Sequence, residues 1–286
     1  MQYKFSNGIY DFNTRTYIMG ILNITPDSFS DGGKYFDGKV NIDRVISDAV
    51  KMERYGADFI DIGGESTRPG AVKISIDEEL ERVVPVIVHL KKNINIPISI
   101  DTYKSIIAEE SLKAGAEIVN DISGFHFDEN IAAVTAKYNA SCILMHIKGN
   151  PENMQINPHY ENVVEEVYSY LRESVNIAKR YQINQIILDP GIGFGKTLEH
   201  NLTLIRNLWK FKESGYPILL GVSRKSFIDK IYKSEASDRL EGTISANVFG
   251  IINGSNIIRV HDVLENKRAT MVADRLSGRY NSCPVK

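Results

Sequence analysis

The chain has 286 residues, of which 43% are hydrophobic and 24% charged, and its formal net charge is −2. The weak negative charge excludes bulk attraction to nucleic acid or to an anionic membrane. Two cysteines are too few for a disulfide framework, and Cys142 lies inside an apolar run, where we expect it to be buried. No apolar run approaches the ~18 residues of a membrane helix, and the first residues lack the apolar core of a signal peptide. We therefore expect a cytoplasmic protein.

Short apolar runs alternate with helix-like segments along the whole chain. The runs predict strands at 17–23, 58–62, 97–100, 117–120, 142–145, 185–188, 217–222 and 256–260. The first helix should lie between Asn41, a suitable N-cap, and Gly56, and the second should start at Ser75 with the spacing of a capping box. Further helices are predicted at 103–114, 129–138, 161–181, 198–212, 236–250 and 263–276, with another entered at Ser226.

Eight strand-and-helix units predict a closed parallel (β/α)8 barrel, a TIM barrel, in one domain. The rival is an open doubly wound sheet, which usually has fewer strands and a glycine-rich phosphate turn after the first one. No G-x-G-x-x-G follows residues 17–23, so the closed barrel is favoured. The predicted boundaries are an N-terminal cover segment at 1–16 with a hairpin turning at Asn7-Gly8, the barrel at 17–276 and a flexible tail at 277–286. The active site of such a barrel lies at the carboxyl ends of its strands.

Carboxylates follow several of the apolar runs directly. Asp61, Asp101, Asp121 and Asp189 each stand at a predicted strand end, where one alone could simply cap a helix or anchor a loop. Four that converge on one barrel mouth would repel each other unless a ligand with N–H donors, or a metal, offset their charge. With Asn120 beside them, these groups suit the edge of an amide-like heterocycle.

Basic groups gather late in the chain, at Arg224-Lys225 after the seventh strand and at Arg259 and His261 around the eighth. Loops at these positions commonly bind phosphate in barrels. Together with Arg68, which lies in a glycine-rich loop after the second strand, they predict a clamp for a polyanion. A hard Mg²⁺ held by one or two protein oxygens and by substrate phosphate fits this setting. His146 has no partner at a metal-ligand spacing, so zinc is not expected.

Two further loops have the composition of functional segments. The first, residues 23–33, is long, polar and ends in Gly-Gly, which suggests a mobile lid. The other, residues 189–197, ends like a nucleotide-binding P-loop, but Pro190 stands where that motif requires glycine. We therefore do not expect nucleotide binding through this loop.

With these residues in view, the chain resembles the dihydropteroate synthase family of folate biosynthesis from about residue 18 to residue 275. The resemblance rests on several motifs in a fixed order, which together are very specific. They are GILNITPDSFSDGG (20–33), DIGGESTRPG (61–70), SIDTYK (99–104), NDISG (120–124), MHIKGNPENMQ (145–155), LDPGIGFGKT (188–197), GVSRKS (221–226) and IIRVHDV (257–263).

The resemblance implies a transferase that joins p-aminobenzoate to 6-hydroxymethyl-7,8-dihydropterin diphosphate and releases diphosphate and 7,8-dihydropteroate. We expect an SN1-like alkyl transfer with the pterin diphosphate binding first. It also implies a Mg²⁺ cofactor, a homodimer formed through the late helices, and inhibition by sulfonamides, which mimic p-aminobenzoate.

The resemblance further assigns roles to individual residues. Asp101, Asn120 and Asp189 would grip the pterin, with Lys225 on its carbonyl oxygen and Arg259 across its face. Ile122, Met145 and Phe194 would be its apolar walls. Asn23 would ligate the metal, and Arg68, Arg259 and His261 would hold the diphosphate with it. The p-aminobenzoate slot would consist of Thr67, Arg68, Pro69, Phe194, Lys225 and Ser226. The catalytic set is expected to be Asn23, Asp31, Asp101, Lys225, Arg259 and His261.

Two alternatives remain at this point. A pterin-dependent methyltransferase would share the pterin grip but would not need a diphosphate clamp. A non-catalytic pterin-binding paralogue would retain the pocket without turnover. The basic residues weigh against the first alternative, and the complete first loop weighs against the second.

Overall fold

The structure is a computed structural model, and it describes residues 1–25, 35 and 40–279. Its eight barrel strands are β3 Tyr17–Asn23, β4 Phe59–Gly63, β5 Ile98–Asp101, β6 Ile118–Asp121, β7 Ser141–Met145, β8 Ile186–Asp189, β9 Leu219–Leu220 and β10 Ile257–Val260. They are all parallel and lie in the order β8-β7-β6-β5-β4-β3-β10-β9. A parallel bridge between Leu188 and Ile218 joins the two outer strands. The predicted (β/α)8 barrel is confirmed.

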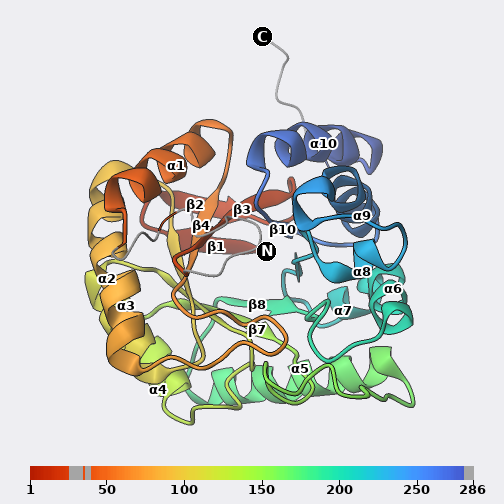
Figure 1. Ribbon diagram of the computed structural model, residues 1–286, viewed down its shortest axis with the longest axis horizontal. Helices are drawn as coiled ribbons and strands as arrows, with labels where there is room; N and C mark the ends of the chain where they lie inside the picture. The colour runs from red at the N-terminus through yellow and green to blue at the C-terminus, as the bar shows by residue number, and fades with distance from the viewer. Residues whose placement is uncertain (26–34, 36–39, 280–286) are drawn as a thin grey trace.

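Helices surround these strands as an outer ring (Figure 1). They are α1 Ile42–Arg54, α2 Ile76–Asn93, α3 Ser105–Ala114, α4 Ile131–Lys137, α5 Val163–Arg180, α6 Leu198–Arg206, α7 Leu208–Lys212, α8 Ser226–Asp229, α9 Leu240–Ile252 and α10 Val263–Leu276, with a 3-10 turn at Ala236–Asp238. Both predicted N-caps are confirmed, because the Asn41 side chain accepts from the Arg44 N–H and the Ser75 hydroxyl from the Glu78 N–H. None of the described helices is long and apolar enough to cross a membrane.

The structure differs from the prediction mainly between residues 198 and 250. The helix expected at 198–212 is divided at Asn207, whose side chain turns back onto the carbonyl of Thr203 at 2.8 Å and competes with the helical pattern. The seventh strand has only two paired residues, and the helix entered at Ser226 is a single turn. The helix expected at 236–250 is a 3-10 turn followed by α9.

The N-terminal end of the barrel is closed by aromatic side chains. A hairpin of β1 Gln2–Phe5 and β2 Gly8–Asp11 turns at Ser6-Asn7, one residue earlier than expected. Its buried aromatic residues pack against a layer of inward-facing side chains that all eight strands but β5 supply. The hairpin members of this cluster are Tyr3, Phe5, Tyr10 and Phe12, and the strand members are Tyr17, Met19, Phe59, Ile118, Ile143, Ile187, Leu219 and Ile257. Solvent and substrate therefore reach the barrel interior from the opposite end.

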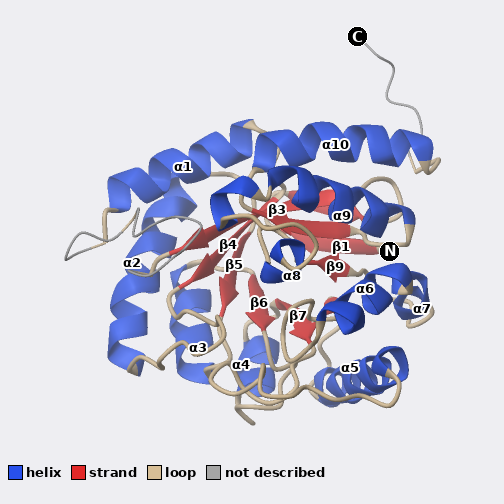
Figure 2. Ribbon diagram, turned by 45° about the vertical axis from the view of Figure 1, so that its right-hand side comes forward, coloured by secondary structure: helices blue, strands red, loops and turns tan. Residues whose placement is uncertain are grey.

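The strand period of two then decides which side chains line that open end. Successive strand residues point to opposite faces, so the residue two positions after each inward apolar residue also points inward. Two steps beyond Phe59, Ile118, Ile187 and Ile257 stand Asp61, Asn120, Asp189 and Arg259. The apolar layer thus forms the floor under a polar layer. The strands that carry both layers lie inside the ring of helices (Figure 2).

The segment after α10 was predicted as a flexible tail at 277–286, and the structure describes it as far as Arg279. The guanidinium of Arg279 donates to the Ile251 carbonyl at 2.7 Å and also to the Ser255 carbonyl. These contacts tie the start of the segment to the loop between α9 and β10. Residues 280–286 lie outside the described part of the chain.

Candidate active site

One arginine binds two buried carboxylates at the centre of the barrel mouth. Arg259 donates from Nε to Asp61 Oδ2 at 2.6 Å and from Nη2 to Asp101 Oδ2 at 2.9 Å. Asn120 donates from Nδ2 to the same Asp61 oxygen at 3.0 Å. The structure thus brings together residues from β4, β5, β6 and β10, although they are up to 198 positions apart in sequence.

Each of these two carboxylates keeps one oxygen without a hydrogen-bond partner. Asp61 Oδ1 and Asp101 Oδ1 are buried and accept no hydrogen bond from any described residue. Buried acceptors are normally satisfied, because an unpaired one costs about 1–3 kcal/mol. Burial raises the pKa of Asp101, and the charge of Arg259 opposes that rise. The pair therefore suits a ligand that supplies N–H donors.

Asp189 and Lys225 form the second part of the mouth. A methyl group placed on Gly221 would lie 3.8 Å from both Asp189 Oδ2 and Lys225 Nζ, so these two groups flank the same glycine. Lys225 also donates to the Ile192 carbonyl, and its Nζ lies 4.8 Å from the centroid of the Phe194 ring. Burial lowers the pKa of Lys225 to about 8, against the effect of the Asp189 carboxylate.

Asp121, the fourth carboxylate predicted at the mouth, lies elsewhere. It is the neighbour of the inward-facing Asn120, so its side chain points to the opposite face of β6. Its Oδ1 accepts from the Ser123 N–H and hydroxyl, each at 2.7 Å, and its Oδ2 from the Phe125 N–H at 2.8 Å. The prediction that four carboxylates converge is wrong for Asp121, which organises the loop after β6 instead.

Cations collect around His261, which follows β10. Its Nδ1 lies 3.0 Å from the Ser223 hydroxyl. Burial lowers the pKa of His261 well below its usual value, and so do the charges of Arg224, Arg259, Arg68 and Lys225. Arg224 is committed to Asp262 through two hydrogen bonds of 3.0 and 2.6 Å. Positive charge therefore accumulates at one side of the mouth of a protein whose net charge is negative.

The apolar residues expected beside the pterin also lie together. Ile122, Met145, Ile147 and Met154 form one buried cluster, against which Tyr103 and Phe194 pack. Thr67 and Pro69 lie on the loop after β4, and Ser226 is the exposed first residue of α8. The side chains of these three residues make no hydrogen bond or ion pair to the described groups of the mouth. The apolar residues predicted to bind the pterin therefore contact one another, whereas Thr67, Pro69 and Ser226, predicted to bind p-aminobenzoate, are not held by such contacts in the described part of the chain.

Asn23 ends β3 next to the carboxylates. A methyl group on Gly63 would lie 3.5 Å from Asn23 Oδ1 and 3.9 Å from Asp101 Oδ2, so both oxygens face the same glycine. No group of three or more histidine, cysteine, aspartate or glutamate side chains in the described ranges could hold a metal by itself. Asp31, the remaining predicted catalytic residue, lies outside the described residues.

An ion network that the sequence interpretation missed holds the loop after β4. Lys104 Nζ lies 2.6 Å from Glu65 Oε2 and 2.7 Å from Glu79 Oε2, and Tyr103 donates its hydroxyl hydrogen to Glu65. Glu65 and Lys104 belong to the recognised motifs, but Glu79 lies on α2 and is only 1% exposed. A glutamate on the face of α2 that also carries Val83 and Val86 was the available signal.

Comparison with known proteins agrees with this geometry. The sequence model of the family described as "Pterin binding enzyme" matches residues 19–261. The dihydropteroate synthase of Clostridium beijerinckii is 49% identical over 274 residues, which cover 95% of this chain and 98% of that protein.

Solved structures agree as well. A Yersinia pestis dihydropteroate synthase in complex with a sulfonamide drug superimposes with a TM-score of 0.91 at 37% identity and covers 97% of this chain and 99% of its own. The Xanthomonas albilineans enzyme with 4-aminobenzoic acid has a TM-score of 0.85 at 35% identity and covers 94% and 95%. The chain therefore belongs to the pterin-binding enzyme family and, within it, to the dihydropteroate synthases.

Proposed function

We propose that this protein joins p-aminobenzoate to the methylene carbon of 6-hydroxymethyl-7,8-dihydropterin diphosphate, releasing diphosphate and forming 7,8-dihydropteroate. The observation that carries the proposal is the pair of unpartnered carboxylate oxygens on Asp61 and Asp101 beside the cations around His261. A pterin diphosphate has N–H donors at one end and a polyanion at the other. A single ligand of this kind satisfies both halves of the mouth.

The pterin is held through its pyrimidine edge. Asp101, Asn120 and Asp189 face this edge, and Lys225 donates to the pterin carbonyl oxygen and ring nitrogen. Support comes from the position of Lys225 beside Asp189, which lets a carboxylate acceptor and an ammonium donor meet neighbouring atoms of one ring. Ile122, Met145 and Phe194 pack on the ring faces.

The diphosphate is held by Arg68, Arg259 and His261. Arg259 has five N–H bonds and uses two on Asp61 and Asp101, so three remain for the substrate. Neutral in the free protein, His261 is expected to take up a proton when the anion enters, because its pKa is depressed partly by the same cations that the anion neutralises.

The residues at the end of β3 fit a bound Mg²⁺. The amide oxygen of Asn23 is a hard ligand, and a magnesium ion usually keeps several waters and takes one or two protein oxygens together with substrate phosphate. When bound, the ion would neutralise charge that develops on the departing diphosphate.

The chemical step requires little acid or base catalysis. The electron-rich dihydropterin stabilises a cation at its exocyclic methylene when the C–O bond to diphosphate breaks. The aniline nitrogen of p-aminobenzoate attacks this carbon without prior deprotonation and then loses one proton to water or to the released diphosphate. The carboxylates of Asp101 and Asp189 favour that positive charge, while the cations favour the leaving group. Correct placement of two reactants can supply about 7–11 kcal/mol of such a barrier. We therefore propose an SN1-like transfer with the pterin diphosphate bound first.

Thr67, Arg68, Pro69, Phe194, Lys225 and Ser226 are proposed to form the p-aminobenzoate slot. The loop that carries Arg68 is held in place by Glu65 and Lys104 and by a hydrogen bond of 3.0 Å from the Gly70 N–H to the Pro151 carbonyl. Sulfonamides are proposed to compete for the same slot, as a structure of the Yersinia pestis relative with a sulfonamide drug suggests.

A methyltransferase has no use for a cluster of cations at the mouth, so the surroundings of His261 favour the synthase over that alternative. We place the reaction in the cytoplasm. The one cysteine in the described ranges, Cys142, is buried and free, as is usual in a reducing compartment.

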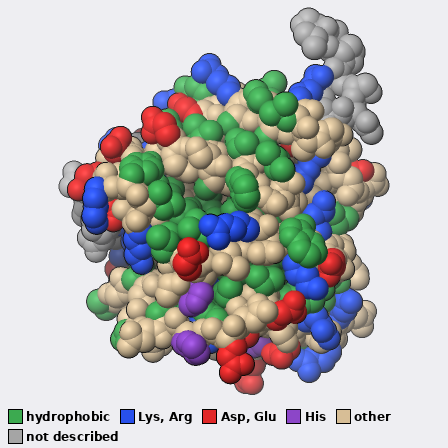
Figure 3. Space-filling view, turned by 90° about the vertical axis from the view of Figure 1, so that its right-hand side faces the viewer, with side chains coloured by type: hydrophobic (Ala, Val, Ile, Leu, Met, Phe, Trp, Pro, Cys, Tyr) green, Lys and Arg blue, Asp and Glu red, His purple; other side chains and the backbone are tan. Residues whose placement is uncertain are grey.

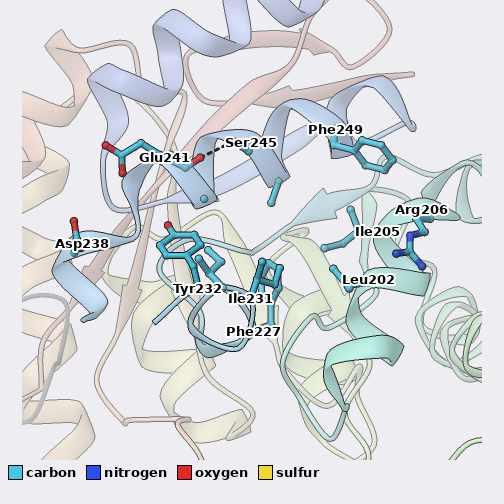
Figure 4. A pocket seen from close by; sticks show the side chains of 13 residues that line it. Leu202, Ile205, Arg206, Phe227, Ile231, Tyr232, Asp238, Glu241, Ser245 and Phe249 are labelled. Atoms are coloured by element: carbon cyan, nitrogen blue, oxygen red, sulfur yellow. Dashed lines mark hydrogen bonds between the residues drawn. The ribbon is translucent and has the colours of Figure 1, made fainter. Parts of the chain in front are cut away.

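We further propose a homodimer through α9 and α10. Large apolar side chains are exposed on these helices, including Phe249, Ile252, Met271, Val272 and Leu276. Phe249 also lines a groove of about 560 Å³ between α6, α8 and α9, together with Phe227 and Ile231 (Figure 4). Apolar groups also gather in the upper half of the face that carries these helices (Figure 3). A second copy would cover this surface, and no predicted site residue lines the groove.

Removal of the site cations should abolish diphosphate release. We expect Lys225→Ala and Arg259→Ala to lower kcat/KM by about 100- to 1000-fold, because each removes a charged donor from a water-poor site. Lys230→Ala, which changes an exposed lysine at the end of α8, is the matched control and should retain activity. The measurement is diphosphate release from the pterin diphosphate with Mg²⁺ and p-aminobenzoate. A wild-type protein that binds the pterin but releases no diphosphate would support the non-catalytic alternative.

The rate should depend on pH through Lys225. Burial lowers its pKa to about 8, so the protonated donor is present below this pH and is lost above it. We expect kcat/KM for the pterin diphosphate, which reports the free enzyme, to fall about tenfold per pH unit above pH ~8. Lys225→Arg should remove this alkaline limb, because arginine stays protonated. An identical limb in both proteins would show that another group is responsible.

The dimer is tested by sedimentation velocity at micromolar concentration. We expect the wild type to sediment as a dimer and Phe249→Asp as a monomer, since a buried unpaired carboxylate strongly opposes association. Ile9→Asp, on an apolar residue of the N-terminal hairpin that is more exposed than Phe249, should leave the dimer intact. A monomeric wild type would refute the proposed interface.

A further inference from the structure

Lys196 is a buried lysine that the proposed reaction does not use. It is the lysine of the segment that resembles a nucleotide-binding loop, yet its side chain is only 1% exposed. It forms no ion pair with any described carboxylate. Its Nζ instead lies 2.8 Å from the Gly191 carbonyl, 2.9 Å from the Phe194 carbonyl and 2.8 Å from His146 Nδ1.

The two carbonyls accept from the Lys196 side chain, His146 Nδ1 is its third partner, and the His146 carbonyl lies 3.5 Å away. Burial lowers the pKa of Lys196 well below its usual value, against the effect of the Asp189 carboxylate. Burying a polar group is costly unless it is hydrogen-bonded, so these contacts keep Lys196 in place. The lysine thereby ties the end of β7 to the loop between β8 and α6.

That loop has an irregular backbone whose carbonyls are held by side-chain contacts. Gly191, Gly193 and Gly195 have φ angles of 69°, 87° and 64°, alternating with residues of ordinary conformation. Successive carbonyls therefore point in different directions, and each one from 191 to 195 accepts from a side chain. The Gly193 carbonyl accepts from Gln155 at 2.6 Å and the Gly195 carbonyl from Tyr160 at 2.8 Å. Lys196 supplies two of the five contacts.

The same loop positions Lys225. Its fifth carbonyl, on Ile192, accepts from Lys225 Nζ, and the Phe194 ring lies 4.8 Å from that nitrogen. We infer that Lys196 is a positioning residue for the transfer reaction. It shapes the β8–α6 loop so that Ile192 and Phe194 hold the Lys225 ammonium at the p-aminobenzoate slot, and it does not itself touch substrate. The role of Lys225 in this inference rests on the proposed function.

The test compares Lys196→Met, which keeps the length but loses the donors, with the wild type. We expect kcat/KM for p-aminobenzoate to fall by about 100-fold, with KM rising about tenfold, because small displacements of positioned groups have effects of this size. The dissociation constant of the pterin diphosphate, which Lys225 and Phe194 also contact in the proposed function, should rise less than ~10-fold, since Asp101 and Asn120 come from other strands and keep their positions. Active sites are counted by pterin binding, so misfolded protein does not enter the kinetic constants.

A loss confined to the number of active sites, with KM for p-aminobenzoate unchanged, would overturn the inference, because a purely structural role predicts that result. Unchanged constants would overturn it as well. If Lys196→Met does not fold, the paired variants His146→Asn and His146→Leu replace it. Asparagine places an oxygen near the position of Nδ1, whereas leucine offers Lys196 no acceptor.

We expect His146→Asn to stay within about threefold of the wild type and His146→Leu to show the raised KM for p-aminobenzoate. Equal constants for the two variants would contradict the role of Lys196. The activity of the wild type distinguishes a failure of the proposed function from a failure of the positioning role. If it forms no dihydropteroate, the proposed function fails; if it does and the Lys196 and His146 variants match it, only the positioning role fails.

Discussion

The contact of Arg259 with Asp61 and Asp101 is the interaction on which the barrel mouth depends. Two carboxylates within reach of one guanidinium repel each other in a buried setting when both are charged, and the opposite charge between them offsets that repulsion. The arginine does so while each carboxylate keeps one free oxygen. The site is therefore stable without substrate and still has acceptors for it. A lysine at position 259 would supply the charge but not the fork that spans both partners.

The rest of the molecule holds this contact in place above the closed end of the barrel. The aromatic hairpin and the apolar layer close one end of the barrel, so water and ligand approach the carboxylates only from the other. Polar networks in the loops then fix the groups around them. Glu65, Glu79 and Lys104 hold one loop, and Lys196 with His146 holds another. This organisation separates charge within a short distance, with acceptors for a cation on one side and donors for an anion on the other.

The sequence predicted the barrel and the location of its site because strand ends carry a local signal. An apolar run followed by Asp61, Asp101 or Asp189 marks both an element and its functional end. The helix predicted at 263–276 has the same bounds in the structure. The direction in which a single side chain points was harder to predict. In a strand buried on both sides, apolar residues occur at every position, so periodicity did not reveal that Asn120 faces inward and Asp121 outward.

Contacts that involve backbone carbonyls also could not be predicted from the sequence. Lys196 looked like part of a failed nucleotide motif, because nothing in its neighbours records that Gly191 and Phe194 turn their carbonyls towards it. The short length of strand β9, which has two residues, could not be predicted either. The chain leaves the sheet after Leu220 to bring Gly221 and Lys225 to the mouth, although the apolar run itself continues to Val222.

The central claim is that this mouth stabilises separated charge, a pterin methylene cation between carboxylates and a diphosphate among cations. The most direct measurement is the secondary kinetic isotope effect with deuterium on the exocyclic methylene of the pterin diphosphate, under conditions in which the chemical step limits the rate. An SN1-like transfer predicts a clearly normal effect, because the methylene carbon becomes planar before the aniline bonds to it. An effect close to unity would indicate concerted displacement and would contradict the account.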